Sequence, residues 1–101
     1  MKIFLDFYGL ALFVIVARAG GLGAAERTTG IPKATLSRRL CALEASLNVR
    51  LFQRTGRGVV LTVRGEHLYS RSLEGFEMAE KAIEEVRGEA SPETDCNGVS
   101  A

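Results

Sequence analysis

The apolar residues of the N-terminal region predict a buried helix. Residues 7–19 are apolar on almost every side, so this segment is expected to lie at the centre of a small bundle. Asp6 is placed to cap the start of the helix, because its carboxylate can accept backbone N–H groups that the first turn leaves unpaired. Gly20 and Gly21 are expected to end it, since glycine adopts the left-handed conformation of a helix C-terminus without steric cost.

Two further helices are predicted next, separated by a tight turn. A short helix is expected over about residues 22–29, closed by Gly30, and Pro32 can occupy the first turn of a third helix that Asn48 ends. An apolar stripe about 60° wide on this helix faces the core and is formed by Leu36, Leu40, Leu43 and Leu47. The opposite face comprises Ala34, Arg38, Cys41 and Ala45, with Thr35 and Ser37 at its edges and Lys33 at the N-terminal end. Because bulky side chains are absent there, this small and basic face can enter a groove.

A β-hairpin is predicted after the third helix. Short apolar runs at residues 51–52 and 59–61 flank a loop that contains glycine, which is typical of two antiparallel strands joined by a turn. The tip of this hairpin carries Arg54 and Arg57. The hairpin is therefore expected to form a basic wing beside the third helix.

The last helix is expected over residues 63–87, with Thr62 as its N-cap, and would extend roughly 37 Å, beyond a body of this size. A helix stabilised mainly by its apolar face cannot leave that face in water. We expect it to pair with a second copy of the chain through Leu68, Ser72, Gly75, Phe76, Ala79, Ile83 and Val86. A single frayed helix is the alternative. Residues 88–101 lack periodicity and are expected to form a disordered tail.

Composition and charge limit the chain to one core and point to a polyanionic partner. The chain has 101 residues, of which 47% are hydrophobic, enough for one compact domain. Its net charge of +1 conceals +7 over residues 1–65 and −6 over residues 66–101. Between Arg27 and Arg64, eight lysines and arginines stand against one acidic residue. Such a small core leaves no ligand-sized cleft, so no small-molecule effector is expected.

No catalytic, metal or cofactor site is predicted. Cys41 and Cys96 lie 55 positions apart without clustered histidines, which supports neither a disulfide framework nor a zinc site, and a reducing cytoplasm is expected. His67 has no cysteine or second histidine near it, and a solvated surface histidine is the preferred interpretation over a ligand. Because no nucleophile and base are arranged by motif, an enzyme is not expected.

The N-terminus has some features of a signal peptide, since a basic start precedes an apolar run that ends in an A-x-A pattern. However, Asp6 and Gly9 interrupt the run, and only eight consecutive residues, 10–17, are apolar. That is far fewer than a membrane span needs. The buried helix is the preferred interpretation, and no membrane association is expected.

Seven short motifs keep the order and spacing of a known family. They are Leu12-Phe13-Val14 with Ala17, Ala24-Ala25, Thr35-Leu36-Ser37-Arg38-Arg39-Leu40, Leu43-Glu44, Val49-Arg50-Leu51-Phe52, Arg54-Thr55, and Leu61-Thr62 with Gly65-Glu66. In this order they resemble the N-terminal domain of LysR-type bacterial transcriptional regulators from about residue 6 to residue 87. The resemblance implies a winged helix-turn-helix whose third helix enters the major groove, whose wing touches the DNA backbone and minor groove, and whose last helix pairs with a second protomer.

The resemblance also implies which residues face DNA, and two of the chain's departures from the family pattern bear on its function. In the family, the residues aligned with Lys33, Ala34, Ser37, Arg38 and Arg57 commonly face the duplex. Lys33 replaces a frequent glutamine, which exchanges an adenine reader for a cation suited to guanine or phosphate. Family members continue into a large effector-binding domain, which is not expected within these 101 residues, so the chain is either an isolated DNA-binding fragment or a naturally short member.

Together these observations predict a mostly α-helical fold with a small β-hairpin. We expect a winged helix-turn-helix over residues 1–62, a linker and dimerisation helix over residues 63–87, and a tail over residues 88–101. The predicted function is sequence-specific binding of double-stranded operator DNA as a homodimer, to regulate transcription. The predicted DNA-binding residues are Lys33, Ala34, Thr35, Ser37, Arg38, Arg54 and Arg57. The alternative is a protein-interaction module that forms mixed dimers with longer relatives without binding DNA.

Overall fold

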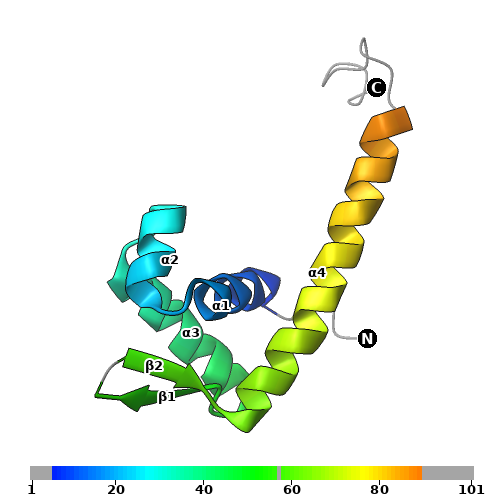
Figure 1. The fold of residues 1–101 in the computed structure, drawn as a ribbon. Helices are drawn as coiled ribbons and strands as arrows, with labels where there is room; N and C mark the ends of the chain where they lie inside the picture. The colour runs from blue at the N-terminus through cyan, green and yellow to red at the C-terminus, as the bar shows by residue number, and fades with distance from the viewer. Residues whose placement is uncertain (1–5, 57, 90–101) are drawn as a thin grey trace.

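Three helices, a two-stranded hairpin and one long helix follow each other along the chain (Figure 1). The computed structural model describes residues 6–56 and 58–89. In chain order the elements are α1 (Phe7–Ala19), α2 (Leu22–Thr29), α3 (Lys33–Leu47), β1 (Phe52–Thr55), β2 (Gly58–Leu61) and α4 (Val63–Glu89). The three-helix body, its hairpin and the long last helix confirm the predicted winged helix-turn-helix fold.

Helix α1 lies at the centre of the molecule, because α2, α3 and α4 all pack against it. The buried core consists of Leu12, Phe13, Val14, Val16, Ala25, Leu36, Leu40, Leu43 and Leu51. The fully buried ring of Phe13 meets the ring of Phe52 edge-on, with 5.4 Å between their centroids, and so attaches the hairpin to the core. The prediction was wrong for Leu47, which is 37% exposed because it is the last residue of α3 and lies outside the packed cluster.

The ends of the helices are fixed by the residues that the sequence indicated. Asp6 caps α1, and its Oδ1 accepts a hydrogen bond of 2.8 Å from the backbone N–H of Gly9. Helix α1 ends at Gly20 with φ 92°, and α3 ends at Asn48 with φ 57°, both in the left-handed region. Pro32 differs by one position from its predicted place, because it is the N-cap of α3 rather than a residue of its first turn.

A carboxylate joins the C-terminal part of α3 to the start of the hairpin. Oε2 of Glu44 accepts hydrogen bonds from the backbone N–H groups of Leu51 and Phe52, at 2.7 and 3.1 Å. Charge-assisted hydrogen bonds of this kind are stronger than neutral ones. The hairpin is therefore held to α3 as well as to α1.

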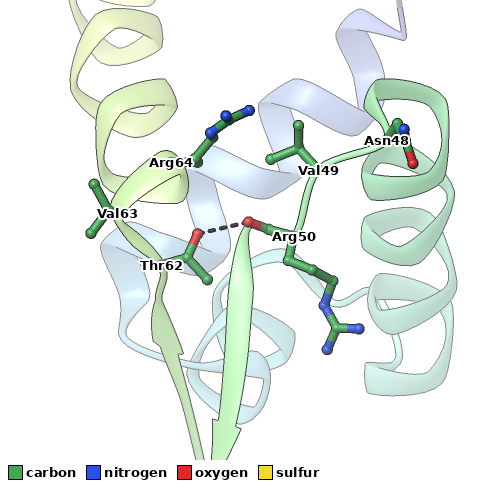
Figure 2. Close-up of a pocket in the computed structure, with 6 residues that line it drawn as sticks. All are labelled: Asn48, Val49, Arg50, Thr62, Val63 and Arg64. Atoms are coloured by element: carbon green, nitrogen blue, oxygen red, sulfur yellow. Dashed lines mark hydrogen bonds between the residues drawn. The ribbon is translucent and has the colours of Figure 1, made fainter.

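The start of α4 is bonded to the segment that precedes β1. The hydroxyl of Thr62 accepts a hydrogen bond of 2.9 Å from Gly65 N, as the predicted cap should, and donates one of 2.7 Å to the carbonyl of Arg50 (Figure 2). The backbone N–H of Thr62 donates a further one of 2.9 Å to the carbonyl of Leu51. A Cβ atom at Gly65 would overlap that same carbonyl oxygen, so the two segments can approach this closely only with glycine there.

Helix α4 packs on the body with its first half and extends away from it with its second half (Figure 1). The side chains that lie half-buried against the core are Leu68, Tyr69, Leu73 and Phe76. Every residue from 77 to 88 is exposed, and the described residues measure 53 × 33 × 20 Å, so the predicted overhang is confirmed. The helix continues two residues further than predicted, to Glu89, and residues 90–101 of the predicted tail lie outside the described residues.

No single helix in residues 6–56 and 58–89 is long and apolar enough to cross a bilayer. Helices α1 and α2 reach the required length and composition only as a pair that is bent by 112° between them.

Candidate nucleic-acid interface

The outward face of α3 exposes the side chains that were predicted to meet a partner. Lys33, Ala34 and Arg38 are exposed, and Thr35 and Ser37 are half-buried at the edges of the face. The guanidinium of Arg38 turns back along the helix, where its Nη2 donates a long hydrogen bond of 3.4 Å to Thr35 Oγ1. The N-terminal half of α3 therefore presents two cations, separated by short side chains.

Arg39, the neighbour of Arg38, serves a different surface. Its guanidinium carbon lies 4.8 Å from the centroid of the Tyr8 ring, a cation–π contact that joins α3 to the start of α1. Successive residues of a helix point about 100° apart, so Arg38 can face outward while Arg39 faces α1. The sequence prediction did not assign this pair. Arg39 lies on the opposite side of the outward face from Ser37. This angular position is the signal that could have predicted different contacts for Arg38 and Arg39.

The hairpin supplies the second candidate basic surface. Strands β1 and β2 pair antiparallel, with Phe52 opposite Leu61 and Arg54 opposite Val59, which confirms the predicted hairpin. The side chain of Arg54 is exposed on β1. Arg57 lies outside the described residues, so its contribution to the tip stays a prediction.

Acidic side chains do not neutralise this surface. Glu44 is the single acidic residue between Arg27 and Arg64, and its carboxylate is bonded to backbone amides at the hairpin. In the described part of the chain, the ion pair that forms joins Arg71 to Glu74 on α4, at 3.6 Å. Residues 6–56 and 58–89 contain no group of His, Cys, Asp and Glu side chains that could hold a metal ion.

The residues predicted to form a dimer interface fall into two groups. Leu68, Ser72 and Phe76 are half-buried, and Leu68 and Phe76 pack against the core of their own chain. The exposed group consists of Gly75, Ala79, Ile83 and Val86. Leu73, which the prediction omitted, is half-buried in the same contact with the core. Its spacing, four residues after Tyr69 and three before Phe76, is the signal that could have placed it on this face.

A mainly apolar groove of about 320 Å³ runs between α1 and α4. Its walls are Ala11, Val14, Ile15 and Arg18 of α1 and Leu73, Phe76, Glu77, Ala79, Glu80 and Ile83 of α4. Ile83 is 55% exposed at its edge. The groove places the apolar surface of α4 beside that of α1, with one cation and two carboxylates among the lining side chains.

A second hollow of about 470 Å³ lies at the opposite end of α3 from Lys33 (Figure 2). It is an open depression over the junction of α3, β1 and α4, and the side chains of Arg50 and Arg64 on its rim point in different directions (Figure 2). The hydroxyl of Thr62 in its wall is already bonded within the junction. The prediction that the fold leaves no hollow of ligand size was therefore wrong, since the volumes of this hollow and of the groove both reach the few hundred Å³ of a typical ligand pocket.

Comparison with known proteins places this architecture in a family. The family model described as "Bacterial regulatory helix-turn-helix protein, lysR family" matches residues 7–66, from α1 into the first turn of α4. The protein is thus a winged helix-turn-helix protein by its fold. The chain belongs to the lysR family of bacterial regulatory proteins.

Relatives and solved structures agree with this assignment. The chain is 46% identical over 57 residues to the HTH-type transcriptional regulator TfdT of Cupriavidus pinatubonensis. This alignment covers 56% of this chain and 25% of the relative. Full-length AphB, a virulence activator of Vibrio cholerae, matches with a TM-score of 0.73 at 37% identity over 80% of this chain and 28% of its own. The DNA-binding domain of CbnR, solved in complex with DNA, matches with a TM-score of 0.72 at 31% identity over 85% of this chain and 99% of its own.

The chain covers 21% to 27% of the length of three of its curated relatives. These relatives are named as gene activators or transcriptional regulators, which is a non-enzymatic role.

Proposed function

We propose that this chain binds double-stranded operator DNA and regulates transcription. The observation that carries the proposal is the exposed face of α3, where Lys33 and Arg38 stand among short side chains and form no ion pair with a carboxylate of residues 6–56 or 58–88. A helix with such a face fits the major groove, whose width admits an α-helix. The similarity to the DNA-bound domain of CbnR supports the same conclusion.

Each part of the surface has a distinct task in this proposal. Recognition helices contact base edges with their N-terminal residues, so Lys33 and Arg38 reach bases or adjacent phosphates, and Ser37 adds a short hydrogen bond. Ala34 and Thr35 let the helix approach the groove closely. Arg54 and Arg57 of the hairpin meet phosphates or a narrow minor groove and carry less sequence information.

The test of DNA binding is a titration of random-sequence duplex at several salt concentrations. Phosphate contacts release condensed counterions, so affinity should fall steeply with salt, by about 0.9 in the logarithmic slope for each phosphate neutralised. A double variant, Lys33→Ala with Arg38→Ala, removes two exposed cations without touching the core. Binding that is absent at low salt, or that does not change in the double variant, would contradict the proposal.

We also propose a homodimer held by α4. After Phe76 the small and apolar residues of α4 are exposed, although they continue the stripe that Leu68 and Phe76 begin. The groove between α1 and α4 widens this apolar surface and can accept a second helix. An exposed apolar stripe along a helix is stable in water only when another surface covers it.

Sedimentation equilibrium over nanomolar to high micromolar concentration tests the dimer. The expected result is a monomer–dimer transition within this range, and a monomer at the highest concentration would refute it.

No observation in the structure favours the alternative of a partner module without DNA binding, because such a module has no need of an unneutralised cationic face. As a DNA-binding protein, the chain is expected to act in the cytoplasm.

A further inference from the structure

We propose that the operator presents guanine to Lys33 and Arg38, so that α3 selects G·C pairs at two positions of each half-site. The inference rests on the proposed DNA binding and adds the class of base sequence that this face reads. It follows from which hydrogen-bonding groups the face offers and which it lacks.

The long side chains on the outward face are donors only. Lys33 ends in an ammonium group and Arg38 in a guanidinium group, neither of which can accept a hydrogen bond. The remaining positions carry the short side chains of Ala34, Ser37, Cys41 and Ala45, with Thr35 at one edge. A partner for this face must therefore present acceptors at the two places that the cations reach.

Guanine is the base whose major-groove edge presents two adjacent acceptors, N7 and O6. In the major groove, adenine presents one acceptor and one donor, and cytosine presents a donor. Thymine presents a single acceptor beside a methyl group. An asparagine or glutamine is needed to match adenine with both of its groups, and a carboxylate to match cytosine. Donor-only side chains thus discriminate in favour of guanine.

Two side chains of α3 that could read the other bases, Glu44 and Asn48, are engaged elsewhere or lie far from the N-terminal half of this face. The carboxylate of Glu44 is bonded to the amides of Leu51 and Phe52. The amide-bearing Asn48 caps the far end of α3, about 22 Å from Lys33 at 1.5 Å per residue, and Gln53 belongs to β1.

The position of Arg38 brings its guanidinium to the reading end of the helix. Its Nη2 lies 3.4 Å from Thr35 Oγ1, one turn closer to Lys33 than the backbone of Arg38 itself. This contact occupies one N–H of the guanidinium and leaves the others available. No carboxylate within residues 6–56 and 58–89 forms an ion pair with either cation. Both are therefore free to contact bases in the half of a recognition helix that reaches base edges.

Arg39 provides a matched control for charge. It is also an exposed arginine of α3, adjacent to Arg38, but its guanidinium lies over the Tyr8 ring, 4.8 Å from the centroid. Replacing it removes the same charge from the same helix without touching the outward face. A loss of base preference caused by general electrostatics would appear in this control as well.

The experiment selects duplexes from a library of random sequence with the full chain and with three variants, Lys33→Gln, Arg38→Gln and Arg39→Gln. The wild-type protein should enrich guanine at two positions of each half-site. Lys33→Gln should change the preference at one of them from guanine to adenine by about ten-fold, and Arg38→Gln should do so at the other. Arg39→Gln should keep both preferences and lose affinity about equally for all sequences.

Four results would overturn the inference. Enriched sites without guanine at the positions that the variants alter would show that the cations contact phosphates only. An equal change of preference in Arg39→Gln would show that the effect is not specific to the outward face. Binding to duplex with no sequence preference would refute the inference and leave the proposed DNA binding intact, whereas binding to no duplex at low salt would overturn both.

Discussion

The body of the protein and the second half of α4 differ in what completes them. In the body, α1 is enclosed by α2, α3 and the first half of α4, and the buried apolar residues pack against one another. From residue 77 to residue 88, α4 has no buried side chain and carries Glu77, Glu80, Glu84 and Glu85 beside exposed Ile83 and Val86. The comparison teaches that one chain holds a basic unit with its own core and an acidic extension whose apolar residues its own body leaves uncovered, so that in the proposed dimer they are covered by a partner.

The largest expected effect lies in the core of the body. Phe13→Ala should lower the free energy of unfolding by about 3–5 kcal/mol, because it leaves a cavity and removes the contact with Phe52 that attaches the hairpin. Urea denaturation followed by circular dichroism measures this loss. A loss below about 1 kcal/mol would mean that the body does not depend on its own core and would remove the contrast with α4.

The second largest effect should appear in the free energy of dimerisation and not in the stability of the body. Ile83→Ala should weaken dimerisation by about 2–5 kcal/mol if Ile83 is buried between two copies. Sedimentation equilibrium measures the change. The matched control is Met78→Ala, which removes a side chain that is 74% exposed on another face of α4 and should leave association unchanged. Phe76→Ala is less informative, since Phe76 also packs on its own core. Equal losses for Ile83→Ala and Met78→Ala would place the interface elsewhere.

Helix α4 should tolerate an added methyl group at Gly75 but not at Gly65, where it joins the body. Gly65→Ala should cost about 1–3 kcal/mol of stability, because the added Cβ overlaps the carbonyl of Leu51. Gly75→Ala, on the same helix but with no atom within 4 Å of the new Cβ, should stabilise the helix by about 0.5–1 kcal/mol. Thermal unfolding of both variants gives the comparison. Effects of the same sign would mean that the close approach at Gly65 does not restrict the fold.

The last expected effects concern how the basic residues of the body share DNA binding. Arg38→Ala should cost about 1–3 kcal/mol of operator binding and flatten the preference at one operator position. Arg57→Ala should weaken binding to all sequences alike and lower the salt slope by about one unit. Binding to a library of operator variants, repeated at several salt concentrations, distinguishes the two. If both variants lose affinity equally for every sequence, the assignment of Arg38 to base reading is wrong.

Features that depend on neighbouring residues were predictable from the sequence. Asp6 and Thr62 cap helices through bonds to N–H groups three residues away, and Asn48 ends α3 through its own backbone conformation. The outward face of α3 was predictable for the same reason, because helical periodicity sets which residues share it. The assignment of its residues to DNA remains a prediction.

Features that depend on segments far apart in the sequence were not predictable. The contact of Arg39 with Tyr8 joins two helices, and the bonds of Glu44 form only where the hairpin returns to α3. The close approach at Gly65 was not predicted, because the carbonyl that it must accommodate belongs to the segment before β1. Spacing along one element contains no information about such encounters.

The bonded junction between the body and α4 also sets a length. Thr62 and Gly65 fix the angle at which α4 leaves the hairpin, so in the proposed dimer the two α3 helices are held at one separation. Operators of helix-turn-helix dimers place their half-sites about one helical turn of DNA apart, or a multiple of it. The side chains of α3 would then determine which bases are read, and the close contact at Gly65 would determine how many base pairs lie between the two readings.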